Sequence, residues 1–208
     1  MTDPQLQVLH ALRIRGLASE AVLAVVTGLA VEEVQDLLAA MATTGLVARR
    51  GGRMPGFTLT AQGTATHVSR LAEDMSTDTR QQVEQAYGRF LPVNTAFKHL
   101  CTSWQLRLMP DGSEVPNDHT DAVYDAVVVE RLAALHGDVV RVVADVVAEL
   151  PRFATYDPRF TAALRRVQDG DRSAFSRPLS DSYHDIWMEL HEDFLLSLGR
   201  TRGEADGH

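Results

Sequence analysis

Residues 17–63, LASEAVLAVVTGLAVEEVQDLLAAMATTGLVARRGGRMPGFTLTAQG, decide the fold of this chain. The segment predicts two helices separated by a turn at Thr27-Gly28, because glycine readily adopts the positive φ that ends a helix. The second helix is expected from about Val31 to Thr43. Its apolar residues recur at i, i+3, i+4 and i+7, which places them on one face: Val34, Leu37, Leu38 and Met41.

Two short strands are expected after that helix, at residues 46–48 and 57–59, joined by a loop over residues 49–56. The loop is rich in glycine and arginine. Thr60 is expected to cap the next helix, just as Asp3 and Ser19 are expected to cap the first two. Helix, turn, helix and a two-stranded wing form a winged helix-turn-helix, so the sequence predicts a mainly α fold that begins with this unit.

The segments LAVVTGLAVEEVQDLLAAMATTGLVARR and FTLTAQG resemble the DNA-binding core of MarR-like transcriptional regulators. The resemblance covers about the first third of the chain. It implies a DNA-binding regulator whose second helix, from Val31, docks in the major groove. Gln35 is then the expected base reader, Thr43 lies near the far end of the helix, and Arg49, Arg50 and Arg53 contact phosphates or the minor groove.

Three acidic residues stand where that helix would approach DNA: Glu32, Glu33 and Asp36. Carboxylates repel phosphates, whereas acids in the first turn of a helix also favour the helix dipole. The alternative is therefore a winged-helix regulatory module that binds a protein or a small ligand without binding DNA.

Charge is unevenly distributed along the 208 residues, whose net charge is −8. Residues 1–70 hold six arginines and five acidic residues, so the remainder is strongly acidic. Because an acidic surface repels nucleic acid, DNA contact is expected only from the N-terminal segment. A single cysteine, Cys101, precludes an internal disulfide and suits a reducing cytoplasm. The absence of a long apolar run and of a signal-peptide pattern also predicts a cytoplasmic protein without membrane contact.

The rest of the chain predicts helices. Residues 1–75 are expected to form the DNA-binding domain, residues 76–200 a helical dimerisation and effector domain, and residues 201–208 a flexible tail. Within the second domain, Pro92 is expected to interrupt one helix, residues 109–120 to form a loop, and Thr120 or Asp118 to cap the helix that follows. The last helix is expected from about Leu179 to Leu198. Long helices after a winged domain also favour a homodimer, which would suit a two-fold DNA site.

His184 and His191 lie on one face of the last predicted helix, while Glu189, Glu192 and Asp193 are expected on its solvated side. Three interpretations remain open for the histidines: a polar core, contacts to a small effector, or a metal site. The predicted effector pocket combines them with apolar walls formed by Trp104, Tyr124 and Trp187.

A metal site would need one of these histidines together with Asp118, His119 or His136, because two histidines two turns apart cannot share one metal. ALRRVQDGDRSAF, residues 163–175, is loosely similar to the effector domain of FadR-like GntR regulators, which implies such a site. The prediction nevertheless names no metal and no cofactor. It also names no catalytic residues, because the chain lacks a nucleophile motif, a P-loop and a dinucleotide fingerprint.

Overall fold

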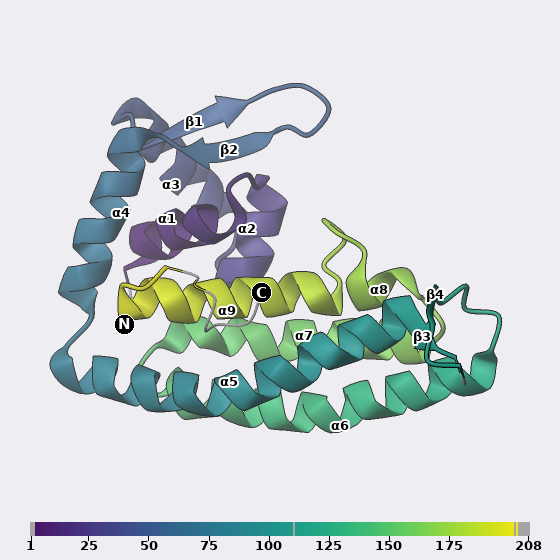
Figure 1. Ribbon diagram of the computed structural model, residues 1–208. Helices are drawn as coiled ribbons and strands as arrows, with labels where there is room; N and C mark the ends of the chain where they lie inside the picture. Colours follow the sequence, from purple (N-terminus) through teal and green to yellow (C-terminus); the bar gives the residue numbers. More distant parts are fainter. Residues whose placement is uncertain (1–2, 110, 202, 204–208) are drawn as a thin grey trace.

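The computed structural model describes residues 3–109, 111–201 and 203. The described chain is mainly helical and contains two small antiparallel sheets of two strands each. The predicted mainly α class is therefore confirmed. Figure 1 shows the N-terminal elements stacked above a layer of long C-terminal helices. The predicted tail falls largely on residues outside the described part of the chain.

The N-terminal elements follow the predicted order, and the predicted caps are confirmed. The side chains of Asp3, Ser19 and Thr60 each accept a hydrogen bond from a backbone N–H in the first turn of the following helix. Gly28 ends the second helix with a φ of 74°. The elements are α1 (Pro4–Arg15), α2 (Glu20–Thr27), α3 (Val31–Thr43), β1 (Val47–Arg50), β2 (Gly56–Leu59) and α4 (Ala61–Asp74).

Gly63 explains why glycine stands just inside α4. A Cβ atom at this position would lie 2.0 Å from the carbonyl oxygen of Leu46, which is backbone and cannot move aside. The close approach lets the first turn of α4 pack against the chain that enters β1. The β1–β2 hairpin then pairs Val47 with Leu59 and Arg50 with Gly56.

The C-terminal elements are longer. They are α5 (Thr77–Gln105), β3 (Leu106–Leu108), β4 (Glu114–Pro116), α6 (Ala122–Val147), the 3₁₀ helix η1 (Pro151–Thr155), α7 (Tyr156–Gln168), α8 (Ser173–Ser176) and α9 (Tyr183–Leu198). Ser76 caps α5, which agrees with the break expected near residue 76.

The predicted interruption at Pro92 is wrong, because α5 continues through it. Proline removes one backbone N–H and leaves the carbonyl four residues earlier without its helical donor. That residue is Gly88, which is exposed, so water can satisfy the freed carbonyl. Buried residues lie on both sides of Pro92, among them Phe90 and Phe97. Their packing outweighs the cost of the lost helical hydrogen bond.

Three other helix and loop boundaries also differ from the prediction. The expected loop at residues 109–120 contains strand β4, which pairs with β3, and Asp121 rather than Thr120 or Asp118 caps α6. The last helix begins at Tyr183, four residues later than expected, because Ser182 and Asp185 form a capping box. Both Leu179 and Asp181 precede it with positive φ values of 59° and 48°.

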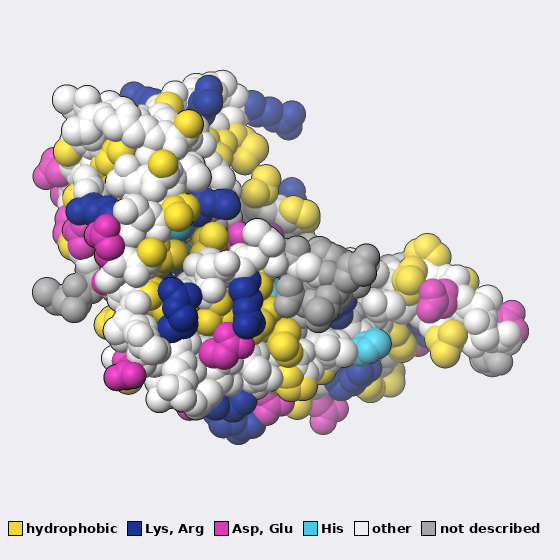
Figure 2. All heavy atoms as spheres, turned by 60° about the vertical axis from the view of Figure 1, so that its left-hand side comes forward, with side chains coloured by type: hydrophobic (Ala, Val, Ile, Leu, Met, Phe, Trp, Pro, Cys, Tyr) yellow, Lys and Arg dark blue, Asp and Glu magenta, His cyan; other side chains and the backbone are white. Residues whose placement is uncertain are grey.

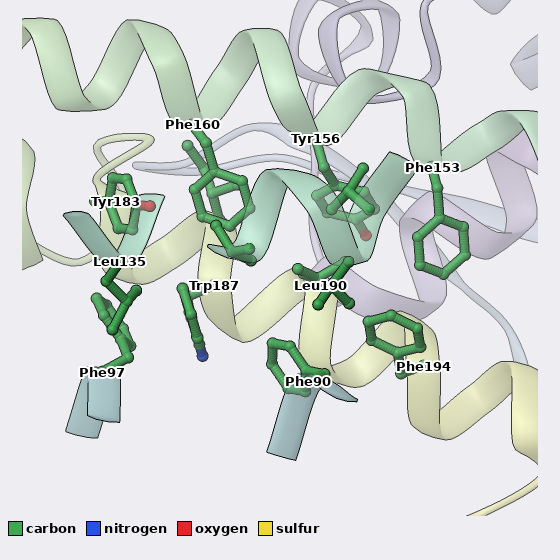
Figure 3. Packing of buried hydrophobic residues seen from close by; sticks show 14 of the residues in the cluster. Phe90, Phe97, Leu135, Phe153, Tyr156, Phe160, Tyr183, Trp187, Leu190 and Phe194 are labelled. Atoms are coloured by element: carbon green, nitrogen blue, oxygen red, sulfur yellow. The ribbon is translucent and has the colours of Figure 1, made fainter. Parts of the chain in front are cut away.

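Two separate clusters of buried apolar residues hold the fold together. The N-terminal core includes Leu9, Leu38 and Met41, and the C-terminal core includes Phe160 and Trp187. Figure 3 shows aromatic side chains of α5, α7 and α9 packed in the second core. The rings of Phe97 and Trp187 stack with centroids 4.1 Å apart. Helix α9 lies between the two cores, packed against α5 and α7 on one side and α1 on the other.

Candidate functional site

The β1–β2 hairpin carries the only arginine cluster of the N-terminal segment. Arg49, Arg50 and Arg53 are all exposed. None of them takes part in an ion pair with another described residue. Figure 2 shows Lys and Arg side chains at the top of the molecule, where the N-terminal elements lie. These three residues, the hairpin arginines, are therefore free to meet an anionic partner.

Helix α3 lies beside the hairpin and exposes the residues predicted to read DNA. Gln35 and Thr43 are both exposed and lie about two turns apart along the helix. The Thr43 hydroxyl donates to the carbonyl of Ala39 at 3.0 Å, so that donor is already engaged. Glu32 and Glu33 are exposed in the first turn, which has no side-chain cap. Both acids therefore face solvent next to the positive end of the helix dipole.

Three residues of the predicted effector pocket come together on the side of α9 that faces α5. His184, Trp187 and His191 line a groove of about 500 Å³. Trp187 is buried and its indole N–H donates to the Asn94 side-chain oxygen at 2.8 Å. His191 Nε2 lies 3.2 Å from the Tyr87 hydroxyl. Both side chains therefore already have partners inside the core.

Cys101 also borders this groove. Burial raises the pKa of its thiol to about 12, so the thiol stays protonated and is a poor nucleophile.

Trp104 and Tyr124 do not line that groove, so the structure brings together three of the five predicted residues. Trp104 stacks on Phe175 with ring centroids 4.4 Å apart. The Tyr124 hydroxyl donates to the carbonyl of Ser103 at 2.8 Å. Both residues lie where β3 and β4 connect α5 to α6. Gln105, the last residue of α5, still lines the groove. Trp104 is kept out of it because its ring points from another side of α5 toward Phe175 of α8.

The candidate metal ligands are also engaged elsewhere. His119 Nδ1 lies 3.0 Å from Asp125, and His136 Nδ1 lies 3.3 Å from the Tyr183 hydroxyl. Asp118 accepts hydrogen bonds from the backbone and side chain of Thr120. Within the described ranges, no group of three or more His, Cys, Asp or Glu residues converges to hold a metal ion.

A buried polar network links the two cores and was not predicted. The carboxylate of Asp193 is 2.8 Å from His10 Nε2, 3.2 Å from Arg152 Nε and 3.1 Å from the Tyr156 hydroxyl. His10 Nδ1 lies 2.9 Å from His67 Nε2. We call these five residues the junction network. They come from α1, α4, η1, α7 and α9, so the network joins the N-terminal elements to the C-terminal helices.

The expectation that Asp193 lies on a solvated face is wrong, because Asp193 is only 2% exposed. Asp193 follows Leu190 by three positions and precedes Ser197 by four, and both of those residues are buried. This helical spacing is the signal that could have placed Asp193 on the buried face of α9. Nothing in the spacing could have identified its partners, since His10 lies 183 positions away.

The chemistry of Asp193 fixes the proton positions along the network. Burial acts to raise its pKa, but the charge of Arg152 and the hydrogen bonds from His10 and Tyr156 outweigh burial and hold the pKa well below its usual range. The carboxylate therefore accepts a hydrogen bond from His10 Nε2–H. His10 Nδ1 then accepts from His67 Nε2–H, which leaves His67 Nδ1 unprotonated. That atom is buried and has no hydrogen-bond partner among the described residues.

Both histidines are held neutral. Burial is the main cause that lowers the pKa of His10. Burial also lowers the pKa of His67 to about 3, with the neighbouring His10 as the next cause. A proton added to His67 Nδ1 would create a buried cationic N–H without an acceptor, which is costly.

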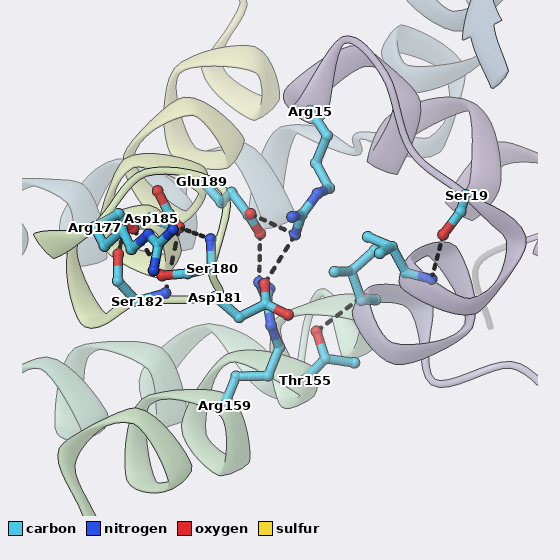
Figure 4. Close-up of polar contacts among 12 residues, drawn as sticks. Arg15, Ser19, Thr155, Arg159, Arg177, Ser180, Asp181, Ser182, Asp185 and Glu189 are labelled. Carbon is cyan, nitrogen blue, oxygen red and sulfur yellow. Dashed lines mark hydrogen bonds and ion pairs between the residues drawn. The ribbon is translucent and has the colours of Figure 1, made fainter. Parts of the chain in front are cut away.

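A second polar cluster joins α1, α7 and α9 (Figure 4). Glu189 of α9 binds Arg15 of α1 at 2.6 Å and Arg159 of α7 at 2.7 Å. Asp181 also contacts both guanidinium groups, at 3.3 and 3.4 Å. Glu189 is thus enclosed between two arginines from separate parts of the chain, and the expectation that it faces solvent is also wrong. Glu192 is half-buried.

Comparisons of the chain with protein-family models, with curated protein sequences and with solved structures found no significant match. Among the described residues, no helix has both the length and the apolar character needed to cross a membrane.

Proposed function

We propose that this chain is a DNA-binding transcriptional regulator, with residues 1–75 acting as a MarR-like winged helix-turn-helix. The single observation that supports this most strongly is the set of exposed hairpin arginines, which form no ion pair with other described residues. In a strongly acidic chain, three guanidinium groups at the tip of a hairpin are positioned to offset phosphate charge. Each phosphate contact of this kind releases counterions and favours binding.

Helix α3 supplies the sequence-reading surface in this proposal. The Gln35 side-chain amide can form two hydrogen bonds to the edge of an adenine in the major groove. Its neighbour Ala39 is also exposed and small, so the backbone of α3 can approach the groove floor closely. The carboxylates of Glu32, Glu33 and Asp36 oppose non-specific binding. Affinity therefore depends on the hairpin and on a matched sequence.

The proposed regulator acts as a homodimer, since two copies related by a two-fold axis present two α3 helices to two half-sites. A small effector is a further candidate partner. The groove lined by His184, Trp187 and His191 is the part of the predicted effector site that remains a candidate.

The test uses fluorescence anisotropy with a random-sequence duplex library, then with the sequences enriched from it, at several salt concentrations. The first variant replaces Arg49, Arg50 and Arg53 with alanine. Its control replaces Arg80, Arg131 and Arg165, which are also exposed and lie outside residues 1–75. We expect the hairpin variant to lose affinity, with a salt slope smaller by about 0.9 for each phosphate contact removed. Equal affinity in the two variants would overturn the proposal.

Exposed acids on α3 favour a second candidate function, a winged-helix module that binds a basic protein partner without binding DNA. Glu32, Glu33 and Asp36 line the exposed side of the first turns of the helix. Replacing all three with the matching amides distinguishes the two functions. A DNA-binding helix should bind duplexes more tightly after this change, since repulsion is removed, whereas a helix that binds a basic partner should lose its target.

A further inference from the structure

A cavity lies where α4 meets the start of α5 and the end of α9. Its volume is about 260 Å³, which is room for about nine water-sized groups. The apolar part of its wall consists of Val68, Leu71, Ala72 and Leu196. It is separate from the candidate effector groove. An apolar ligand in this cavity would therefore contact both the N-terminal elements and the C-terminal helices.

The charged residues at this cavity are unbalanced. Two arginines line it, Arg80 and Arg200, and none of the described acidic residues does. Arg200 Nη2 binds Glu84 at 2.9 Å, so its charge is compensated. Arg80 is exposed and takes part in no ion pair with another described residue. One positive charge therefore remains for a ligand, which favours an anion.

The other polar groups of the wall do not offer an acceptor to a ligand. The Ser197 hydroxyl accepts from Arg152 and donates to the backbone carbonyl of Asp193, each at 2.6 Å. The N–H of Gly199 caps α9 and donates to carbonyls of its last turn. His67 also lines the cavity, but its unpartnered atom, Nδ1, is buried from solvent. An amine or an alcohol would thus find no accessible partner among these groups.

We propose that this cavity binds an aliphatic monocarboxylate of about six carbon atoms. The alkyl chain packs against the apolar wall, and the carboxylate pairs with the guanidinium group of Arg80. The planar guanidinium group suits a carboxylate because it can donate two parallel hydrogen bonds. Burial of the chain supplies most of the affinity, since an ion pair with an exposed arginine is weak. The proposal concerns binding alone and does not depend on DNA binding.

Isothermal titration calorimetry with sodium hexanoate tests the proposal, with ionic strength held constant by sodium chloride. We expect saturable binding of hexanoate and an upward shift of the melting temperature, because the ligand binds only the folded chain. Absence of saturable hexanoate binding would overturn the proposal.

Two further ligands separate the role of the chain from the role of the charge. Butanoate, which has a shorter chain, should bind about tenfold more weakly, since each buried methylene changes the affinity by about a factor of four. Hexanamide keeps the chain but is uncharged, and it should bind about threefold to fivefold more weakly. If butanoate binds as tightly as hexanoate, the apolar wall is not the binding surface. If hexanamide does, the ligand is not recognised as an anion. Either result would contradict the proposal.

Arg80→Gln removes the positive charge and keeps a long polar side chain. Hexanoate should then bind only as tightly as hexanamide, whereas the affinity for hexanamide should stay unchanged. The matched control is Arg131→Gln, because Arg131 is also exposed but does not line this cavity. Equal weakening of hexanoate binding in both variants would show non-specific attraction and contradict the proposal.

Ala72→Phe fills the cavity from its apolar wall and leaves both arginines in place. Ala72 is exposed on α4, so we expect a circular dichroism spectrum like that of the unmodified protein, together with loss of hexanoate binding. The matched control is Ala65→Phe, at an exposed position of the same helix that does not line the cavity. Unchanged hexanoate affinity in folded Ala72→Phe protein would place the ligand elsewhere and overturn the assignment.

Discussion

The β1–β2 hairpin and the junction network are both built from charged residues, yet they are assembled in opposite ways. The hairpin arginines lie within five positions of one another, are exposed, and form no ion pair with described residues. The junction network draws its members from five elements and buries them almost completely. The first region contributes charge to the surface, whereas the second joins two cores.

This difference has an energetic consequence. Exposed charges are solvated in both the folded and the unfolded state, so they contribute little to stability. Buried charges have lost their hydration, and each depends on its partners to offset that loss. We therefore expect changes in the hairpin to alter binding while leaving the fold intact. Changes in the junction network should weaken the fold itself.

Replacing Asp193 with alanine should have the largest effect on stability. It leaves Arg152 as a buried cation without its carboxylate and removes the acceptor for His10 and Tyr156. Breaking a buried charge pair on one side costs about 3–5 kcal/mol. Urea unfolding would measure the change, with Glu130→Ala, an exposed acid on α6, as the control. A loss no greater than that of the control would show that the network does not hold the cores together.

Gly63→Ala should have the next largest effect, because the added Cβ meets the Leu46 carbonyl oxygen at 2.0 Å. The backbone must shift, and overpacking of this kind costs about 1–3 kcal/mol. Gly88→Ala is the matched control, since a Cβ there meets no atom within 4 Å. In the interior of α5 that change should instead stabilise by about 0.5–1 kcal/mol. Thermal unfolding would show whether each variant is more or less stable than the unmodified protein. If Gly88→Ala also destabilises, the contact with Leu46 is not the reason for the loss at Gly63.

Acid should destabilise the fold through the junction histidines. Folding lowers the pKa of both His10 and His67, so below about pH 6.5 the unfolded chain binds more protons than the folded one. Stability is therefore fully present above that pH and falls as pH decreases, by up to about 1.4 kcal/mol per pH unit for each proton.

Unfolding free energies measured between pH 7 and pH 4.5 would test this expectation. The His67→Gln variant should show a shallower slope than the unmodified protein, because one of the two buried imidazoles is gone. The control is His99→Gln, because His99 is exposed on α5. A slope that is the same in all three proteins would rule out the junction histidines as its origin.

Replacing the three hairpin arginines with alanine should have the smallest effect on stability. These side chains are exposed and outside any ion pair among described residues, so the free energy of unfolding should change by less than about 0.5 kcal/mol. Urea unfolding checks this expectation on the same protein that is used for DNA binding. A larger loss would show that the hairpin also supports the fold, and a change in binding could then no longer be attributed to charge alone.

Local patterns in the sequence determined the helices and the caps at Asp3, Ser19 and Thr60, together with the exposed hairpin at residues 47–59. Each of these features depends on residues within a few positions of one another, because caps, turns and helical faces are short-range interactions. The candidate DNA-binding residues could be named for the same reason, since they lie on one helix and one hairpin.

Only the tertiary structure decided the burial of Asp193, the continuation of α5 through Pro92, and the separation of Trp104 from His184. Each outcome depends on which distant elements pack together. His10 and Asp193 lie 183 positions apart, and no local spacing pairs them. The same long-range packing brings α4 and the end of α9 to one cavity. Local sequence propensity cannot predict such contacts, because their free energy arises only when both partners are removed from water together.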